Sequence, residues 1–155
     1  MTLKNAEKEQ KVRNYLFFLL SKKDYTEFEV LLKLENKDYA DESIAKKVVA
    51  DFVEEGYIDD ERCARILVRS MYENQYGYQK IKEKAYLKKI DENLIDREMG
   101  EYDFSVSCLA LADKLVEKIG VKKEDYKEIN KIKRKLLSRG FSFDQVNQAI
   151  SEVIS

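Results

Sequence analysis

Basic side chains recur at helical spacing in two segments of this sequence, 51 residues apart. Residues at i, i+4 and i+8 share one helix face, so Lys80, Lys84 and Lys88 are predicted to form one stripe of cations, and Lys131, Lys135 and Arg139 a second. Arg62, Arg65 and Arg69, at i, i+3 and i+7, extend the first stripe along the preceding helix. Like charges so placed repel one another, and their recurrence therefore predicts an anionic partner. The candidate partner-binding or nucleic-acid-binding residues are Arg62, Arg65, Arg69, Lys80, Lys82, Lys84, Lys88, Lys131, Lys133, Lys135 and Arg139.

Residue types that would support catalysis are missing. The chain has no histidine, which removes the usual general base near neutral pH and the commonest metal ligand. Carboxylates crowd residues 54–61, where a divalent-metal site and a set of helix caps are both conceivable, and we favour caps. Cys63 follows an arginine but falls on an apolar helix face, so we expect an inert buried thiol. The sequence predicts a protein that is not an enzyme, with no cofactor and no bound metal.

The formal net charge of −1 conceals strongly charged bands. Residues 62–89 carry eight basic and two acidic groups (+6), and residues 114–139 carry ten and four (+6). Residues 24–61 carry four basic and thirteen acidic groups (−9). A local field attracts a charged partner more than the net charge does. The two basic bands therefore still predict a polyanionic partner. Tyr76 and Tyr78 lie beside the first stripe and could stack on bases, although packing at a helix edge is the interpretation we prefer.

The elements that position these residues are predicted to be helices. Proline is absent and there are only five glycines, so few turns of special geometry are available. Apolar periodicity predicts about nine amphipathic helices. They cover residues 5–22, 26–37, 41–55, 60–74, 78–89, 91–100, 103–119, 125–139 and 143–154.

Five apolar positions recur three times when the sequence is shifted by 51 residues. They predict a unit of three helices that occurs three times, with domains at 1–57, 58–102 and 103–155. A unit of about 50 residues is marginal alone, so we expect an all-α, elongated and curved array of tandem three-helix repeats with a shared core. The sets are Val30, Ile81 and Ile132; Leu34, Ala85 and Leu136; Tyr39, Ile90 and Phe141; Ile44, Ile95 and Val146; and Val48, Met99 and Ile150.

The longest apolar run, Tyr15 to Leu20, is far shorter than the roughly 20 residues that span a bilayer. Two cysteines cannot build a disulfide framework, which favours a reducing compartment. We therefore expect a cytoplasmic monomer that makes no membrane contact.

Several motifs resemble those of the RecX family of regulatory proteins. The segment from Gly56 to Ala64 resembles the Gly-aromatic-aliphatic-Asp-Asp signature that joins the first two repeats of that family, and Leu136 to Phe143 resembles a C-terminal motif. The resemblance covers roughly residues 10–154. The sequence departs from the family at Cys63, where a large aromatic is usual, at Ala85, where leucine is usual, and at Lys89, where glycine is frequent.

This resemblance implies a modulator of recombination and repair that binds the RecA recombinase and its filament on DNA, and usually inhibits ATPase and strand exchange. It also implies direct binding to single- or double-stranded DNA. The basic stripes would face the filament groove, while the acidic first repeat would contact basic protein surface or remain in solvent. Two alternatives stay open: a helix-turn-helix-like DNA-binding module, and a helical-repeat scaffold for another protein.

Overall fold

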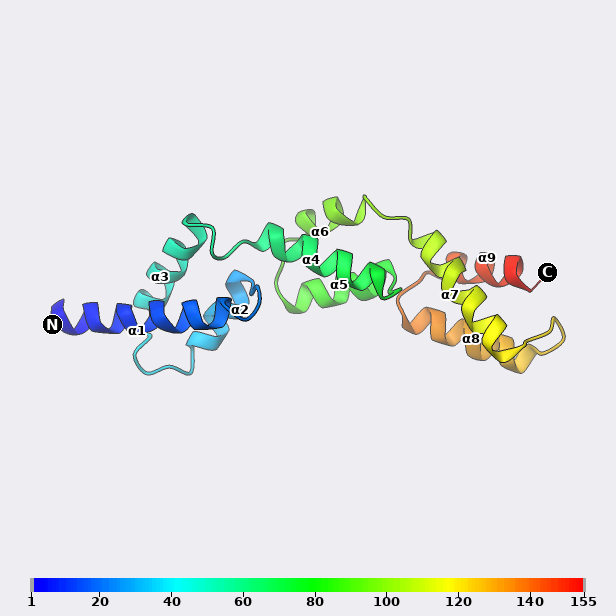
Figure 1. The fold of residues 1–155 in the computed structure, drawn as a ribbon, viewed down its shortest axis with the longest axis horizontal. Coiled ribbons are helices and arrows are strands. Elements are labelled where there is room, and N and C mark those ends of the chain that lie inside the picture. The colour runs from blue at the N-terminus through cyan, green and yellow to red at the C-terminus, as the bar shows by residue number, and fades with distance from the viewer. Residues whose placement is uncertain (1, 155) are drawn as a thin grey trace. The chain divides into compact units, whose positions relative to one another are not determined.

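The computed structural model describes residues 2–154, which form nine helices and no strand within that range (Figure 1). Each predicted helical segment coincides with one helix, so the all-α helical-repeat prediction is confirmed. The helices are α1 (Thr2–Leu20), α2 (Glu27–Leu34), α3 (Glu42–Glu54), α4 (Asp60–Glu73), α5 (Tyr78–Leu87), α6 (Glu92–Met99), α7 (Phe104–Ile119), α8 (Tyr126–Ser138) and α9 (Phe143–Val153).

Side-chain caps fix where several helices begin. At α2 the Thr26 hydroxyl accepts the Glu29 backbone N–H at 3.2 Å, and the Glu29 carboxylate accepts the Thr26 N–H at 2.9 Å. This reciprocal pair is a capping box, which satisfies two backbone donors that the first helical turn leaves without partners. The Asp41 carboxylate caps α3 by accepting the Ile44 N–H at 3.0 Å.

The apolar positions that recur every 51 residues also form the hydrophobic core. Of the recurring apolar positions, every one but Tyr39 is buried, and Tyr39 is half-buried. Helices α1 and α2 contact α3, α5 contacts α6, and α7, α8 and α9 contact one another. The recurring apolar stripes therefore face each other between α2 and α3, between α5 and α6, and between α8 and α9.

The chain divides into two compact units. The first comprises Met1–Cys63 together with Lys88–Asp91, and the second comprises Ala64–Leu87 together with Glu92–Ser155. The predicted domain boundaries at residues 57 and 102 stay a prediction, and the outermost residues of the predicted first and third domains, 1 and 155, lie outside the described residues.

In each of the last two repeats, the turn between the second and third helices contains a residue in the left-handed backbone conformation. Gly140 has φ +99° between α8 and α9, and Lys89, the residue 51 positions earlier, has φ +54° between α5 and α6. Glycine takes this conformation without steric cost, whereas in lysine the Cβ atom makes the conformation unfavourable. The departure from the family motif at Lys89 therefore falls on a position where the backbone favours glycine.

No described helix is both long enough and apolar enough to cross a membrane.

Candidate partner-binding site

Two of the candidate lysines border a single groove between α4 and α5. The groove has a volume of about 500 Å³, and Lys80 and Lys84 stand at its edge. Apolar atoms of Leu67, Met71 and Leu87 also line it, and the Leu87 side chain is 69% exposed. The groove can therefore offer a partner two ammonium groups beside an apolar surface.

These two lysines remain available to a partner. The Lys80 ammonium lies 3.8 Å from the Glu83 carboxylate, a long and exposed ion pair that contributes little to stability. Lys84 is exposed and makes no ion pair with the residues that the structure describes. Of the candidates on α5, Lys80 and Lys84 are thus the ones placed to meet an anionic group.

Lys82 is directed instead toward α6. Its ammonium lies 2.9 Å from both the Glu92 and the Asp96 carboxylates, and hydrogen bonds to these two groups raise the pKa of Lys82 above its ordinary value. The Tyr78 hydroxyl donates to the same Asp96 oxygen at 3.2 Å. Lys82 therefore ties α5 to α6, and a partner would have to compete with two carboxylates for it.

Lys88 does not continue the stripe of Lys80 and Lys84, so the prediction of one helical stripe through all three is wrong. Helix α5 ends at Leu87, and the Lys88 ammonium lies 3.0 Å from the Glu29 carboxylate. Burial of Glu29 alone would raise its pKa, but hydrogen bonds from Thr26 and Lys88 outweigh burial, and the pKa lies below the ordinary value. Lys88 belongs to a junction with the α2 N-terminus.

Arg139, the counterpart of Lys88, belongs to an equivalent junction. Its guanidinium lies over the Tyr76 ring, 4.2 Å from the ring centre, and donates to the Asn74 carbonyl at 3.0 Å. Its own carbonyl accepts the Gly77 N–H at 2.7 Å. Tyr76 is therefore covered by a cation of the protein itself, which supports its interpretation as a packing residue.

The two junctions use matching positions of the repeat. Thr26 and Gly77 are 51 residues apart, as are Lys88 and Arg139. The Thr26 hydroxyl donates to the Lys88 carbonyl at 2.9 Å, just as the Gly77 N–H donates to the Arg139 carbonyl. Charge periodicity could not separate these two cations from exposed ones, because their partners Glu29 and Asn74 lie 59 and 65 residues away in the sequence.

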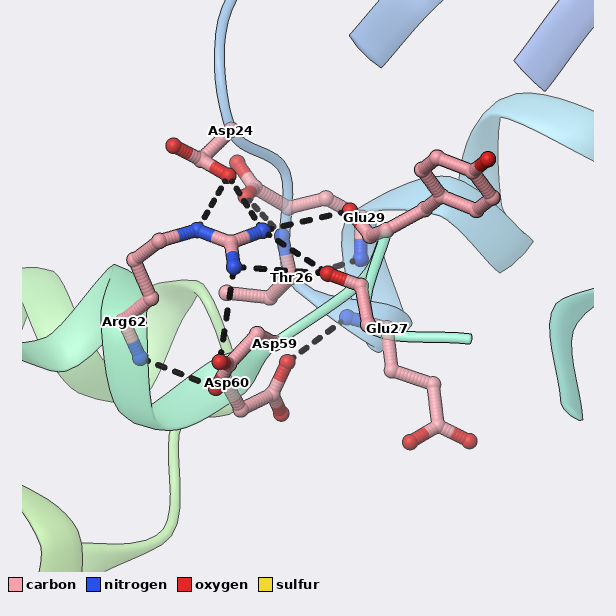
Figure 2. A network of polar contacts seen from close by, with 9 residues as sticks. Asp24, Thr26, Glu27, Glu29, Asp59, Asp60 and Arg62 are labelled. Carbon is pink, nitrogen blue, oxygen red and sulfur yellow. Dashed lines mark hydrogen bonds and ion pairs between the residues drawn. The ribbon is translucent and has the colours of Figure 1, made fainter. Parts of the chain in front are cut away.

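Arg62 is held by acidic groups of the first unit (Figure 2). Its guanidinium lies 2.9 Å from the Asp24 carboxylate and 3.4 Å from Asp59, and it also donates to the carbonyls of Gly56 and Tyr57. The hydrogen bond to Asp24 raises the pKa of Arg62 above its ordinary value. This arginine is a structural residue of the segment that joins α3 to α4.

The acidic cluster at residues 54–61 includes the helix caps that we favoured. Asp59 accepts the Arg62 N–H at 3.0 Å at the start of α4, and Asp60 accepts the Glu27 N–H at 2.9 Å at the start of α2 (Figure 2). In the part of the chain that the structure describes, no group of three or more acidic or cysteine side chains could hold a metal ion.

The remaining arginine candidates lie exposed on α4. Arg69 pairs with Glu73 one turn away, at 3.1 Å, in a fully exposed helix pair. Arg65 is exposed and has no ion pair among the described residues. Arg65 is thus available to a partner, and Arg69 would lose only its weak surface ion pair with Glu73 on binding a partner.

Helix α8 presents a denser basic face than the repeat register predicted. Lys131 and Lys135 are exposed, and Lys131 pairs with Glu128 at 3.4 Å, whereas Lys133 is half-buried. Lys127 and Arg134 are also exposed, and with Lys131 they follow i, i+4 and i+7 spacing. The comparison with the second repeat did not identify Lys127 and Arg134, because the corresponding residues there are Tyr76 and Glu83. The apolar stripe of α8 alone would have predicted both on the helix face opposite to the buried one.

Both cysteines are buried. Burial raises the pKa of the Cys63 thiol to about 11, and nearby carboxylates add to that effect while Arg62 opposes it. Burial also raises the pKa of Cys108 to about 11. Both thiols are thus protonated near neutral pH, and a protonated thiol is a poor nucleophile.

Comparisons with known proteins match most of the chain. Residues 106–150 match the family model described as "RecX, third three-helix domain". The chain is 31% identical over 134 residues to the regulatory protein RecX of Vibrio vulnificus, covering 86% of this chain and 87% of that protein. It is 33% identical over 136 residues to the RecX of Vibrio parahaemolyticus, covering 86% and 85%. The crystal structure of RecX from Lactobacillus salivarius superposes with a TM-score of 0.83 at 28% identity, covering 96% of this chain and 97% of that one.

Proposed function

The chain belongs to the RecX family of regulatory proteins, and on that premise we propose that it binds the RecA recombinase, above all its filament on DNA, and lowers its ATPase and strand-exchange activities. The observation that carries the proposal is the similarity to regulatory proteins named RecX across 86% of the chain. We place this activity in the cytoplasm and assign it to a monomer whose functional domains are the three predicted repeats.

The charge of the surface supports binding to a filament that exposes DNA phosphates and protein acids. Lysines and arginines that bind phosphates release condensed counterions, which makes such binding favourable and dependent on salt. The exposed cations suited to this role lie on α4, at the α4–α5 groove and on α8. They are Arg65, Lys80, Lys84, Lys127, Lys131, Arg134 and Lys135.

The proposed mechanism is occupancy without chemistry. A protein that binds one state of the filament more tightly than another shifts the population toward that state. Contacts that bridge or displace RecA protomers would therefore change filament growth and ATP turnover, with no catalytic group required from this chain.

The direct test is to titrate the protein into RecA that hydrolyses ATP on single-stranded DNA. Inhibition that rises with concentration and saturates is the expected result. An unchanged ATPase rate and unchanged strand exchange at saturating concentrations would refute the proposal.

The surface assignment is tested by charge reversal. Lys80→Glu with Lys84→Glu should weaken filament binding by roughly tenfold, as expected for about 1.4 kcal/mol, while helicity is retained. If both lysines contact phosphates, the log–log salt slope should fall by about 1.5. The matched control reverses Lys122 and Lys123, which are exposed in the loop before α8, and changes the net charge equally. Equal binding by both variants would show that the α4–α5 groove is not the contact surface.

The exposed cations of α8 favour a second candidate, direct DNA binding. Binding to bare duplex should then weaken when Lys127, Lys131 and Arg134 are reversed to glutamate. If duplex binding is lost while RecA inhibition persists, the α8 face serves DNA alone and inhibition depends on another surface.

A further inference from the structure

The first repeat contains an apolar groove that the proposed contact with RecA and DNA does not use. It lies between α2 and α3, within the first compact unit, and has a volume of about 590 Å³. Its apolar lining includes Phe28, Leu31, Leu32, Ala40 and Ala45, and the Leu32 side chain is 49% exposed. Contiguous exposed apolar side chains can mark an interaction site, and Leu32 is the exposed member of this apolar lining.

The corresponding place in the second repeat is bridged by ion pairs. In the 51-residue register, Leu31 and Ala45 correspond to Lys82 and Asp96, whose charged groups lie 2.9 Å apart and tie α5 to α6. Leucine and alanine cannot form that bridge. The internal repeat thus provides its own comparison: the same helix pair is bridged by charges in one copy and left apolar in the other.

The rim of the apolar groove carries acidic groups. Glu35 and Glu42 line it together with Lys46, and Lys46 pairs with Glu42 at 2.9 Å. Glu35 has no ion pair with any residue that the structure describes. The groove therefore combines an apolar floor with a net negative edge.

The segment that forms the groove contains few cations, and Lys46 is the one that lines the groove. Residues 24–61 contain only four basic residues against thirteen acidic ones. Besides Lys46, they are Lys33, which lies 5.4 Å from the Tyr25 ring centre, Lys37, which lies 4.6 Å from the Tyr15 ring centre, and Lys47, which pairs with Glu9. The charged residues that line the groove, Glu35, Glu42 and Lys46, sum to −1, which favours a basic partner over an acidic one.

We propose that the α2–α3 groove binds an amphipathic helix of a protein partner, with apolar anchors on one face and lysine or arginine on the flanks. Apolar side chains at i, i+4 and i+7 of such a helix would cover Leu31 and Leu32, and its flanking cations would meet Glu35 and Glu42. This inference does not depend on which protein supplies the helix, and it is independent of the basic surfaces assigned above.

The probe is a fluorescent helical peptide of leucine and lysine at amphipathic spacing, titrated against the full chain. Binding should raise fluorescence anisotropy, and amide NMR shifts of the unmodified protein should concentrate on residues of α2 and α3. A matched peptide with glutamate in place of lysine should bind at least tenfold more weakly, because the rim repels it.

Two variants locate the site. Leu32→Lys replaces a half-exposed side chain and should weaken peptide binding by about tenfold or more, whereas Val106→Lys, at a 57% exposed position of α7, should leave it unchanged. Leu31→Lys with Ala45→Asp transfers the charged bridge of the second repeat into the first, and should abolish binding if the groove closes. Circular dichroism checks that each variant is folded.

The proposal would be overturned by equal binding of the peptide to Leu32→Lys and to the unmodified protein, by equal binding of the two peptides, or by NMR shifts outside α2 and α3. Concentration-dependent dimers that disappear in Leu32→Lys would overturn it in favour of a second copy of this chain. If the unmodified protein inhibits RecA but does not bind the lysine peptide, the groove proposal alone is refuted. If it binds the peptide in the groove but leaves RecA activity unchanged, only the proposed function is refuted.

Discussion

The contact between Gly77 and Gly140 allows a stability prediction that separates steric fit from backbone strain. A Cβ added at Gly77 would lie 2.4 Å from the Gly140 carbonyl carbon and 2.5 Å from the Phe141 nitrogen. Both contacts are with backbone atoms, which cannot rotate away as a flexible side chain would. Gly77→Ala must therefore push the turn before α5 away from the turn after α8.

The cost follows from the contacts that this displacement breaks. Forcing one extra methyl into a packed position costs about 1–3 kcal/mol. The displacement also breaks the 2.7 Å hydrogen bond from the Gly77 N–H to the Arg139 carbonyl, and a buried unpaired donor costs about 1–3 kcal/mol more. We expect Gly77→Ala to lower the free energy of unfolding by about 2–6 kcal/mol, a large fraction of the stability of a small domain.

The assay is urea unfolding followed by circular dichroism, with hydrogen exchange to localise the effect. Faster exchange at the Gly77 and Gln79 amides, which donate to Arg139 and Gly140, should accompany the loss. The control is Gly120→Ala, because Gly120 has φ +72° but nothing within 4 Å of an added Cβ, so that variant should cost only about 1 kcal/mol. If Gly120→Ala proved the more destabilising variant, the account that close packing against Gly140 requires glycine at position 77 would be refuted.

Lys89→Gly should raise the free energy of unfolding by about 0.5–1 kcal/mol, because it relieves the left-handed strain at φ +54°, and a lower urea midpoint would contradict that account. Cys63 and Cys108 should react slowly with a thiol-specific disulfide reagent until the pH approaches about 11, where both thiols ionise. Their pKa is raised in the folded state, so the unfolded chain ionises first and stability should fall as pH rises from the ordinary thiol value toward 11. Rapid labelling of the folded protein at neutral pH would show that burial does not protect them.

The two equivalent junctions reach the same geometry by different chemistry. At the first, Thr26 and the Glu29–Lys88 ion pair bind the turn after α5, so salt should weaken it. At the second, Gly77 brings backbone to backbone, and the Arg139 guanidinium covers Tyr76. Two matching positions of the repeat thus make the same contact through different chemical groups.

Local patterns in the sequence are sufficient to predict the helices and the core positions. The recurrence of Val30, Ile81 and Ile132 and of the four other apolar sets predicted the buried faces, and all but Tyr39 of these residues are buried. Helical periodicity suffices for this because burial of an apolar stripe depends on local spacing and on the existence of a neighbouring stripe. Composition alone likewise excludes histidine-based chemistry, because the chain contains no histidine.

The packing of the helices, by contrast, determines which cations face solvent. Lys80, Lys82 and Lys88 have the same charge and lie on one short segment, yet Lys80 borders an open groove, Lys82 pairs with two carboxylates of α6, and Lys88 pairs with Glu29. Their partners are 59 residues away for Lys88 and at least 10 away for Lys82, separations that no local pattern encodes. The physical reason is that an ion pair depends on the distance between two charges in space, and only the tertiary arrangement of the helices sets that distance.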